Sequence, residues 1–315
     1  MATAQTAKTQ YVMGTDGIRY AYRELGPLQP PSHTSDSALP LLLHTHYRAN
    51  MDFWDPALAN ALAARRRVVL FDQAGVGRSS GAVATSYAGW AAHVLALAGA
   101  LRLRRFDLAG FSMGGAAVQM VALAAPPGTV RRLVVLGSTA SEPGPAEDGR
   151  ALVWPREGPP AEPIAVLSGG QGEEGAFEGI ARSFFYEDEE GRKHAKAYWA
   201  RVRERSVEGE PHMLEMLGEE GSKRQRLAYA DWATHSLTNS WDRFKELKMP
   251  VLVMNGHNDV LIPTSRSWEM SVRIPNAQLI IYPKSGHGFL YQYAELVAGH
   301  INMFLDGDGA ESAKL

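Results

Sequence analysis

The sequence contains no cysteine, and this absence removes several kinds of chemistry at once. With 0 Cys in 315 residues, disulfides, thiolate nucleophiles and cysteine-based metal sites are excluded. The ten histidines show no His-x-x-x-His spacing beside a carboxylate, so we expect no metal. Gly75-x-Gly77 lacks the rest of a dinucleotide-binding fingerprint. We therefore expect no cofactor.

Long apolar runs and a strong charge of either sign are also lacking. The sequence contains no run of about 18 apolar residues, the length that a membrane span needs. The first ten residues also lack the apolar segment of a secretory signal. The formal net charge of -2 gives no reason to expect a nucleic acid or an anionic membrane as partner. These absences favour a cytoplasmic protein that acts on a small molecule, and they leave a homodimer open.

Short apolar runs alternate with helical stretches along the first part of the chain. Residues 11–26 predict an antiparallel hairpin. Buried strands and helices are then predicted in alternation at 41–43, 55–64, 67–71, 90–103, 106–109, 113–125 and 133–137. Continuous apolar strands separated by helices are typical of a parallel sheet covered on both faces. The sequence therefore predicts an α/β fold with a mostly parallel, doubly wound sheet.

The pattern changes between residues 141 and 240, where no apolar strand occurs. Helical stretches are predicted at 178–186, 192–207 and 213–217. Strands return at 250–254 and 277–282, followed by a last helix at 295–305. We therefore predict a sheet domain in two parts, at 1–140 and 241–305. A helical cap is predicted at 141–240 and a flexible tail at 306–315.

Aromatic residues are frequent in the predicted cap. Four of them are candidates for substrate contact: Phe184, Phe185, Trp199 and Trp232. Aromatic residues at helical spacing also form the packing core of a helical segment. Both interpretations stay open at this point.

A serine flanked by glycines follows the predicted strand at 106–109, in Gly110-Phe-Ser-Met-Gly114. Glycines lack the Cβ atoms that would block the close approach of neighbouring chain in so tight a turn. The turn exposes Ser112 at the carboxyl end of the strand, and the N–H of Met113 points toward any anion formed there. The pentapeptide predicts a nucleophile, although a chain with 31 glycines can also contain it by chance.

Two further side chains follow predicted strands at equivalent places: Asp259 and His287. The carboxyl ends of parallel strands share one edge of a sheet, so residues far apart in sequence converge there. An imidazole oriented by a carboxylate can take the proton of a serine hydroxyl near neutral pH. Ser112, His287 and Asp259 are therefore the predicted nucleophile, base and orienting acid. Glu142, soon after the strand at 133–137, is a competing candidate for the acid.

At these residues the chain resembles the α/β-hydrolases. Four motifs carry the resemblance over residues 11–305, and they stand in the family's order: Phe71-Asp-Gln-Ala-Gly75-Val-Gly-Arg-Ser79, Gly110-Phe-Ser-Met-Gly114, Gly256-His-Asn-Asp259 and Ser285-Gly-His287-Gly. They match the family's loop before the elbow strand, its nucleophile elbow, its acid loop and its histidine loop. The chain order Ser, Asp, His is also the family's order.

The resemblance also implies an oxyanion hole made by two backbone N–H groups. The first maps to Met113. For the second, the usual His-Gly-aromatic pattern is replaced by Thr45-His46-Tyr47, and the position relative to Trp54 indicates Tyr47. His46 stands where glycine is usual, so either it contacts the substrate or its ring bonds local backbone.

The predicted activity is hydrolysis of a carboxylic ester or lactone of a small, largely apolar substrate through an acyl-Ser112 intermediate. A serine at the elbow argues against the family's epoxide hydrolases and dehalogenases, which need a carboxylate nucleophile. Residues 46–56 and 71–80 are similar to cofactor-free haloperoxidases or perhydrolases, which are the main alternative. The elbow also resembles that of carbon–carbon bond hydrolases, but those usually carry tryptophan where Gly288 stands. A receptor, cyclase or lyase using the same pocket stays open.

Overall fold

The structure is a computed structural model that describes residues 1–27, 39–143, 165, 167, 170 and 172–307. Its centre is an eight-stranded sheet with the order β1-β2-β4-β3-β5-β6-β7-β8. The strands are β1 Gln10–Met13, β2 Arg19–Leu25, β3 Leu41–His44, β4 Val68–Phe71, β5 Phe106–Phe111, β6 Val130–Leu136, β7 Val251–Gly256 and β8 Ala277–Tyr282. The β1/β2 and β2/β4 pairs are antiparallel and the remaining pairs are parallel. The predicted hairpin and parallel sheet are confirmed.

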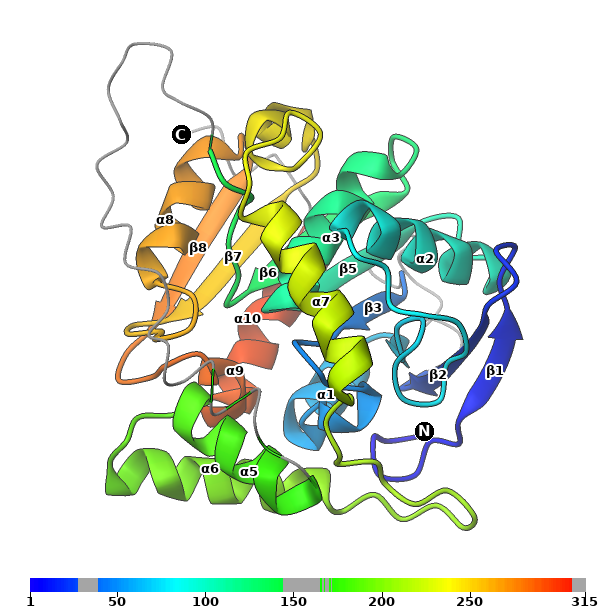
Figure 1. Cartoon of the computed structure of the whole chain (residues 1–315), viewed down its shortest axis with the longest axis vertical. Coiled ribbons are helices and arrows are strands. Elements are labelled where there is room, and N and C mark those ends of the chain that lie inside the picture. Colours follow the sequence, from blue (N-terminus) through cyan, green and yellow to red (C-terminus); the bar gives the residue numbers. More distant parts are fainter. Residues whose placement is uncertain (28–38, 144–164, 166, 168–169, 171, 308–315) are drawn as a thin grey trace.

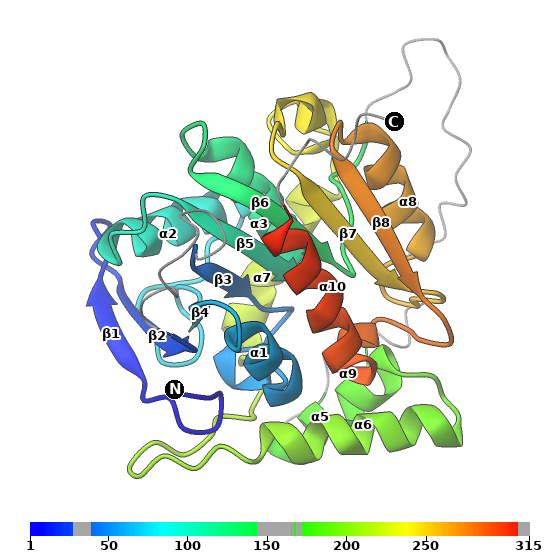
Figure 2. The ribbon, with the colours of Figure 1, turned by 180° about the vertical axis from the view of Figure 1, so that it is seen from behind.

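Helices cover both faces of the sheet. Those on one face include α2 Tyr87–Ala100, α3 Met113–Ala124 and α8 Thr264–Arg273, and those on the other include α1 Pro56–Ala63 and α10 Ala294–Asp306. Figures 1 and 2 show the two layers from opposite sides. Successive residues of β3 enter opposite cores, with Leu42 in one and Leu41 and Leu43 in the other. Because both faces are covered, every residue of β3, β4 and β5 is buried, which explains why these strands are largely apolar. The exception inside β5, Asp107, accepts a hydrogen bond from Arg131 at 2.9 Å.

The chain between β6 and β7, called the insert below, contains α5 Gly172–Phe184, α6 Glu189–Val202, α7 Glu219–Trp232 and the 3₁₀ helix η2 Trp241–Glu246. The α5–α6 pair lies beside α1 and the short helix α9 Phe289–Gln292, and α7 lies apart from it, across the sheet from α10 (Figures 1 and 2). Tyr198 of α6 donates a hydrogen bond to the Phe53 carbonyl at 2.8 Å, and Arg201 donates two to Asp55. The α5–α6 pair is therefore bonded to the chain that follows β3.

The predicted helix at 213–217 is wrong. The Met213 N–H donates to the Asp52 carboxylate at 2.7 Å, and its carbonyl accepts from the Asn50 amide at 2.9 Å. Leu217 and Arg48 exchange two more bonds, at 2.8 and 2.9 Å. The backbone groups of this stretch therefore bond a distant loop instead of one another.

Helix α7 has no counterpart among the sequence predictions. Its buried residues are Ser222, Gln225, Ala228 and Trp232, spaced three or four apart. Two of these four are polar, so the buried face does not read as an apolar stripe.

Most of the Pro- and Gly-rich stretch at 142–172 and the tail residues 308–315 lie outside the described residues. Asp306, the first residue of the predicted flexible tail, instead ends α10 and pairs with Arg66 at 2.6 Å. Within the part of the chain that the structure describes, no helix has the length and apolar character needed to cross a membrane.

Candidate active site

Ser112 occupies a sharp turn between β5 and α3. Its backbone angles are φ 57° and ψ −120°, in a region that residues with side chains rarely adopt. The Ser112 N–H donates to the Leu136 carbonyl at 2.9 Å, and its own carbonyl accepts from Gly115 at 2.8 Å. The strained turn is thus held on both sides by backbone hydrogen bonds.

The two flanking glycines are required by close approach of backbone. A Cβ on Gly110 would clash with the Gly114 carbonyl oxygen, and a Cβ on Gly114 would clash with the carbonyl oxygens of His44 and Thr45. The second clash shows that the loop after β3 lies directly against the start of α3. The glycine pattern in the sequence therefore reports real packing at this turn.

The parallel register brings the three predicted catalytic residues to one edge. Phe111 pairs with Leu136, Leu136 with Met254, and Met254 with Ile280. Ser112 follows the first of these strands directly. Asp259 and His287 follow β7 and β8, so all three loops leave the sheet at its carboxyl edge.

Asp259 and His287 form a buried hydrogen-bonded pair. The distance between His287 Nδ1 and Asp259 Oδ2 is 2.6 Å, and both side chains are fully shielded from solvent. The other carboxylate oxygen accepts from the N–H groups of Leu261 and Ile262, each at 2.9 Å. Three donors therefore fix the orientation of the carboxylate, and the carboxylate fixes that of the imidazole.

The other ring nitrogen of His287, Nε2, has no hydrogen-bond partner among the described residues. The imidazole packs against Phe111, the neighbour of Ser112 in the chain, with ring centroids 4.8 Å apart. Gly137, next to the Leu136 carbonyl that holds the serine turn, also adjoins this ring. One imidazole nitrogen is thus bonded to the acid, and the ring carrying the other lies beside the serine turn.

The loop after β3, which carries Tyr47, the second predicted oxyanion donor, lies against the start of α3. The Met113 N–H stands at the first position of α3, where a helix offers no acceptor of its own. Tyr47 is partly buried, and its hydroxyl accepts from Arg226 of α7 at 3.1 Å. The next residue, Arg48, has a positive φ of 62°.

Arg48 bonds this loop to the insert. Its N–H donates to the Gln225 side chain at 2.8 Å, and its guanidinium donates to the carbonyls of Leu167 and Leu217 at 2.9 Å each, and to that of Gly170 at 3.4 Å. Sequence reasoning missed this role, because the partners lie more than 100 residues away.

His46 lies in the same aromatic surroundings as His287. Its ring is 5.0 Å from that of Phe184 and 5.4 Å from that of Phe111. Its Nδ1 lies 3.1 Å from the Tyr47 carbonyl, and its Nε2 has no partner among the described residues. Burial lowers the pKa of His46 to about 3, with a further contribution from His287. His46 is therefore neutral near pH 7, and it contacts local backbone as well as the aromatic cluster.

The predicted cap aromatics are divided between different places. Phe184 contacts His287, with ring centroids 4.9 Å apart. Phe185 packs on Tyr198 of α6 at 6.4 Å. Phe184 thus contacts the imidazole itself, whereas Phe185 packs on α6 and reaches the backbone of Gly288, where an added Cβ would lie 3.3 Å from its Cζ.

The two tryptophans lie elsewhere. Trp199 packs against Phe53 and Phe177, with ring centroids 6.2 and 5.5 Å apart. Trp232 packs against Tyr87 of α2 at 5.0 Å, in the core on the α2 and α3 face. The ring contacts therefore bring Phe184, and neither tryptophan, to His287.

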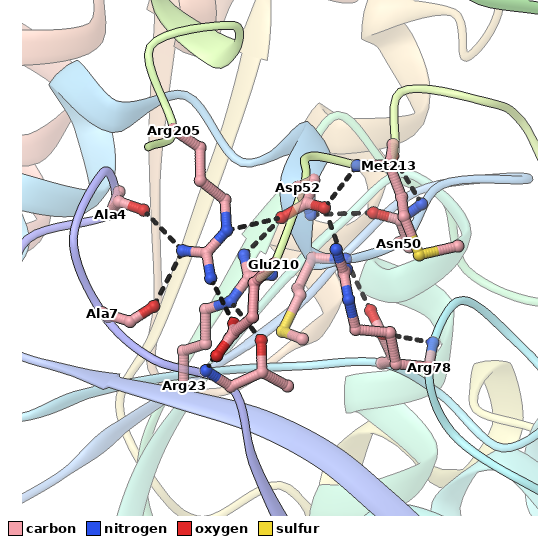
Figure 3. Close-up of polar contacts among 12 residues, drawn as sticks. Ala4, Ala7, Arg23, Asn50, Asp52, Arg78, Arg205, Glu210 and Met213 are labelled. Atoms are coloured by element: carbon pink, nitrogen blue, oxygen red, sulfur yellow. Dashed lines mark hydrogen bonds and ion pairs between the residues drawn. The ribbon is translucent and has the colours of Figure 1, made fainter. Parts of the chain in front are cut away.

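A buried ionic cluster around Asp52, in the 3₁₀ helix η1 Met51–Phe53, supports the same loop (Figure 3). Asp52 pairs with Arg23 and with Arg78, the latter at 2.9 Å, and it accepts from the Met213 N–H. Burial acts to raise the pKa of Asp52, but the two guanidiniums hold it below its ordinary value. In the sequence, this cluster is indicated only by Asp52 itself, a charged residue between the apolar residues Met51 and Phe53.

Arg205 extends this cluster toward the N-terminus. It bonds the Ala7 carbonyl at 2.8 Å and Glu210 at 2.7 Å. The insert, the N-terminal residues and the loop after β3 are thus joined through one set of charges (Figure 3). Among the residues that the structure describes, no group of three His, Asp or Glu side chains could hold a metal ion.

The sheet order, the serine turn and the Asp259–His287 pair are those of an α/β-hydrolase fold. The chain belongs to the alpha/beta hydrolase family, whose model matches residues 41–299.

Several known proteins are similar to this chain along nearly its whole length. The non-heme haloperoxidase of Rhodococcus erythropolis is 25% identical over 304 residues, covering 94% of this chain and 99% of the relative. The bifunctional esterase/perhydrolase DCH of Acinetobacter calcoaceticus is 25% identical over 303 residues, with the same coverage. A solved structure, the alpha/beta hydrolase fold protein from Chitinophaga pinensis, is 30% identical with a TM-score of 0.79, covering 97% of this chain and 100% of that one. These relatives support hydrolase activity.

Proposed function

We propose that the protein hydrolyses a carboxylic ester or lactone of a small, largely apolar substrate through an acyl-Ser112 intermediate. The observation that carries the proposal is the buried bond between His287 and Asp259 at 2.6 Å, on an imidazole whose other nitrogen lacks a partner among the described residues. A base in this state can accept a proton from a nearby hydroxyl.

In this mechanism Ser112 Oγ attacks the ester carbonyl while His287 Nε2 takes the hydroxyl proton. Asp259 keeps the proton-bearing Nδ1 in place and stabilises the imidazolium. The N–H groups of Met113 and Tyr47 donate to the oxyanion of the tetrahedral intermediate. His287 then protonates the leaving alkoxide, and the alcohol departs.

The acyl-enzyme is resolved by a second, similar sequence. His287 takes a proton from a water molecule, whose oxygen attacks the acyl carbonyl and forms a second oxyanion. Collapse of this intermediate breaks the bond to Ser112, and the serine oxygen recovers its proton from the imidazolium. The products are a carboxylic acid and an alcohol, or a hydroxy acid when the substrate is a lactone.

The proposal includes a cap formed by residues 141–240 over a sheet domain at 1–140 and 241–305. The contacts of α6 with Phe53 and Asp55, and of Phe184 with His287, support it. Of the four aromatic candidates, the ring contacts favour Phe184 as a substrate neighbour. His46 is the second candidate, since its ring shares the Phe111 and Phe184 surroundings of His287.

The test measures hydrolysis of methyl acetate through the acid that the reaction releases. Ser112→Ala is expected to lower kcat by several powers of ten, on the order of 10⁴ or more, because the nucleophile is lost. The matched control Ser271→Ala changes a serine of α8 and should leave kcat unchanged. Equal turnover by wild type and Ser112→Ala would refute the mechanism, and absence of turnover in wild type would favour a receptor, cyclase or lyase.

A perhydrolase is the second candidate, favoured by the similarity to the bifunctional esterase/perhydrolase and the non-heme haloperoxidase. In that reaction hydrogen peroxide replaces water as the attacker of the acyl-serine, and a peracid replaces the acid. Peracid formation from acetate and peroxide, lost in Ser112→Ala, would favour this candidate.

A further inference from the structure

Phe184, the last residue of α5, is the part of the insert that lies against the imidazole of His287. The two rings are 4.9 Å apart at an interplanar angle of 74°. Phe184 also contacts Phe111 at 5.5 Å and His46 at 5.0 Å, and only 1% of it is exposed. Its ring therefore occupies the space between the predicted base and the loop after β3.

The backbone of Phe184 is bonded to the histidine loop itself. The Gly288 N–H donates to the Phe184 carbonyl at 2.7 Å. A Cβ on Gly288 would lie 2.9 Å from the Phe184 Cβ, and a Cβ on Gly286 would lie 3.0 Å from its carbonyl oxygen. The glycines on both sides of His287 thus leave room for Phe184. This packing accounts for glycine at position 288, where carbon–carbon bond hydrolases usually carry tryptophan.

The position of the Phe184 ring affects the alcohol part of an ester more than the acyl part. The leaving oxygen must come within hydrogen-bond reach of His287 Nε2, about 2.6–3.2 Å, to receive its proton. The group carried by that oxygen must therefore pass close to the imidazole. A phenyl ring packed on this imidazole reduces the width available to that group, whereas the acyl chain leaves the reacting carbon in a different direction.

We propose that Phe184 is a specificity-determining residue that restricts the alcohol part of the substrate. The substrate class is then esters of short, unbranched alcohols, such as methyl and ethyl esters, together with small lactones. This inference rests on the function proposed above, and it assigns the size limit to one side chain of α5.

The experiment compares kcat/KM for methyl acetate and hexyl acetate in wild type, Phe184→Ala and Phe184→Leu. A single methylene in an apolar pocket changes kcat/KM by about 10-fold or more. Phe184→Ala is therefore expected to raise the hexyl-to-methyl ratio at least about 10-fold, with Phe184→Leu in between. Phe184→Leu keeps an apolar side chain, so it tests the inference if the alanine variant does not fold.

The matched control is Phe177→Ala, a change on the same helix. Phe177 packs against Trp199, with ring centroids 5.5 Å apart, and lies under the Arg192 guanidinium, so it belongs to the packing of the insert. It should leave the ratio unchanged. A second substrate pair, methyl acetate and methyl hexanoate, varies the acyl chain and should respond much less to Phe184→Ala.

Two results would overturn the inference. One is an unchanged hexyl-to-methyl ratio in folded Phe184→Ala and Phe184→Leu, and the other is an equal or larger change in the acyl series. Failure of the proposed function is seen separately, since wild type would then hydrolyse none of these esters or Ser112→Ala would hydrolyse them equally well.

Discussion

Replacing Asp259 with asparagine keeps the shape of the side chain and reverses its hydrogen bonding to His287. The carboxylate accepts three hydrogen bonds, from His287 Nδ1 at 2.6 Å and from the N–H groups of Leu261 and Ile262 at 2.9 Å each. The asparagine oxygen can still accept from the two backbone donors. Its NH₂ group then faces His287 Nδ1, which must become the acceptor.

The expected consequence is a change of imidazole tautomer. With Nδ1 unprotonated, the ring proton moves to Nε2, which can no longer take the Ser112 proton. A loss of this kind lowers kcat by about 10⁴, equivalent to about 5.5 kcal/mol of activation free energy. KM should change little, because neither side chain binds the ground-state ester.

The assay is kcat for methyl acetate in wild type and Asp259→Asn, together with ¹⁵N chemical shifts of the His287 ring to identify the tautomer. Glu142→Gln is the control, because Glu142 is the competing candidate for the acid and its N–H donates to the Trp232 carbonyl at 2.9 Å. It should retain activity near that of wild type. Most of the activity surviving in Asp259→Asn, with a large loss in Glu142→Gln, would show that the orienting acid was wrongly assigned.

Two predictions concern stability. Asp52→Asn breaks a buried pair with Arg23 and should lower the free energy of unfolding, measured in urea, by about 3–5 kcal/mol. The control Glu190→Gln, at an exposed pair with Lys193, should lower it by less than about 1 kcal/mol. Similar losses in the two variants would contradict a stabilising role for the cluster around Asp52. The His46 pKa of about 3 lies below its ordinary value of 6.5, so the unfolded chain binds the extra proton and wild type loses stability as the pH falls below 6.5. Between pH 6.5 and 4.5, wild type should lose about 2 kcal/mol more than His46→Gln, and parallel curves would contradict this.

The sheet could be predicted because its signals are local. The central strands are largely apolar runs buried on both faces, and the loops after β5, β7 and β8 carry the three candidate catalytic residues Ser112, Asp259 and His287. The loops that follow parallel strands meet at the carboxyl edge of the sheet, so these residues converge whatever their separation in sequence.

The insert was harder to predict, for two physical reasons. Helix α7 buries Ser222 and Gln225, whose polar side chains hide its inner face. Phe184 and Phe185 are adjacent and chemically identical, yet only the first makes a ring contact with His287. That difference depends on how α5 is rotated, which in turn depends on packing against distant parts of the chain.

The turn at Arg48 has a consequence for engineering of the candidate site. A positive φ in a residue with a side chain costs about 1–3 kcal/mol, and the bonds of Arg48 to the insert offset that cost. A rearrangement of the insert would therefore release the turn and move the N–H of Tyr47 beside it. With Tyr47 in the oxyanion role proposed above, substitutions that displace these segments would slow the chemical step as well as change substrate binding.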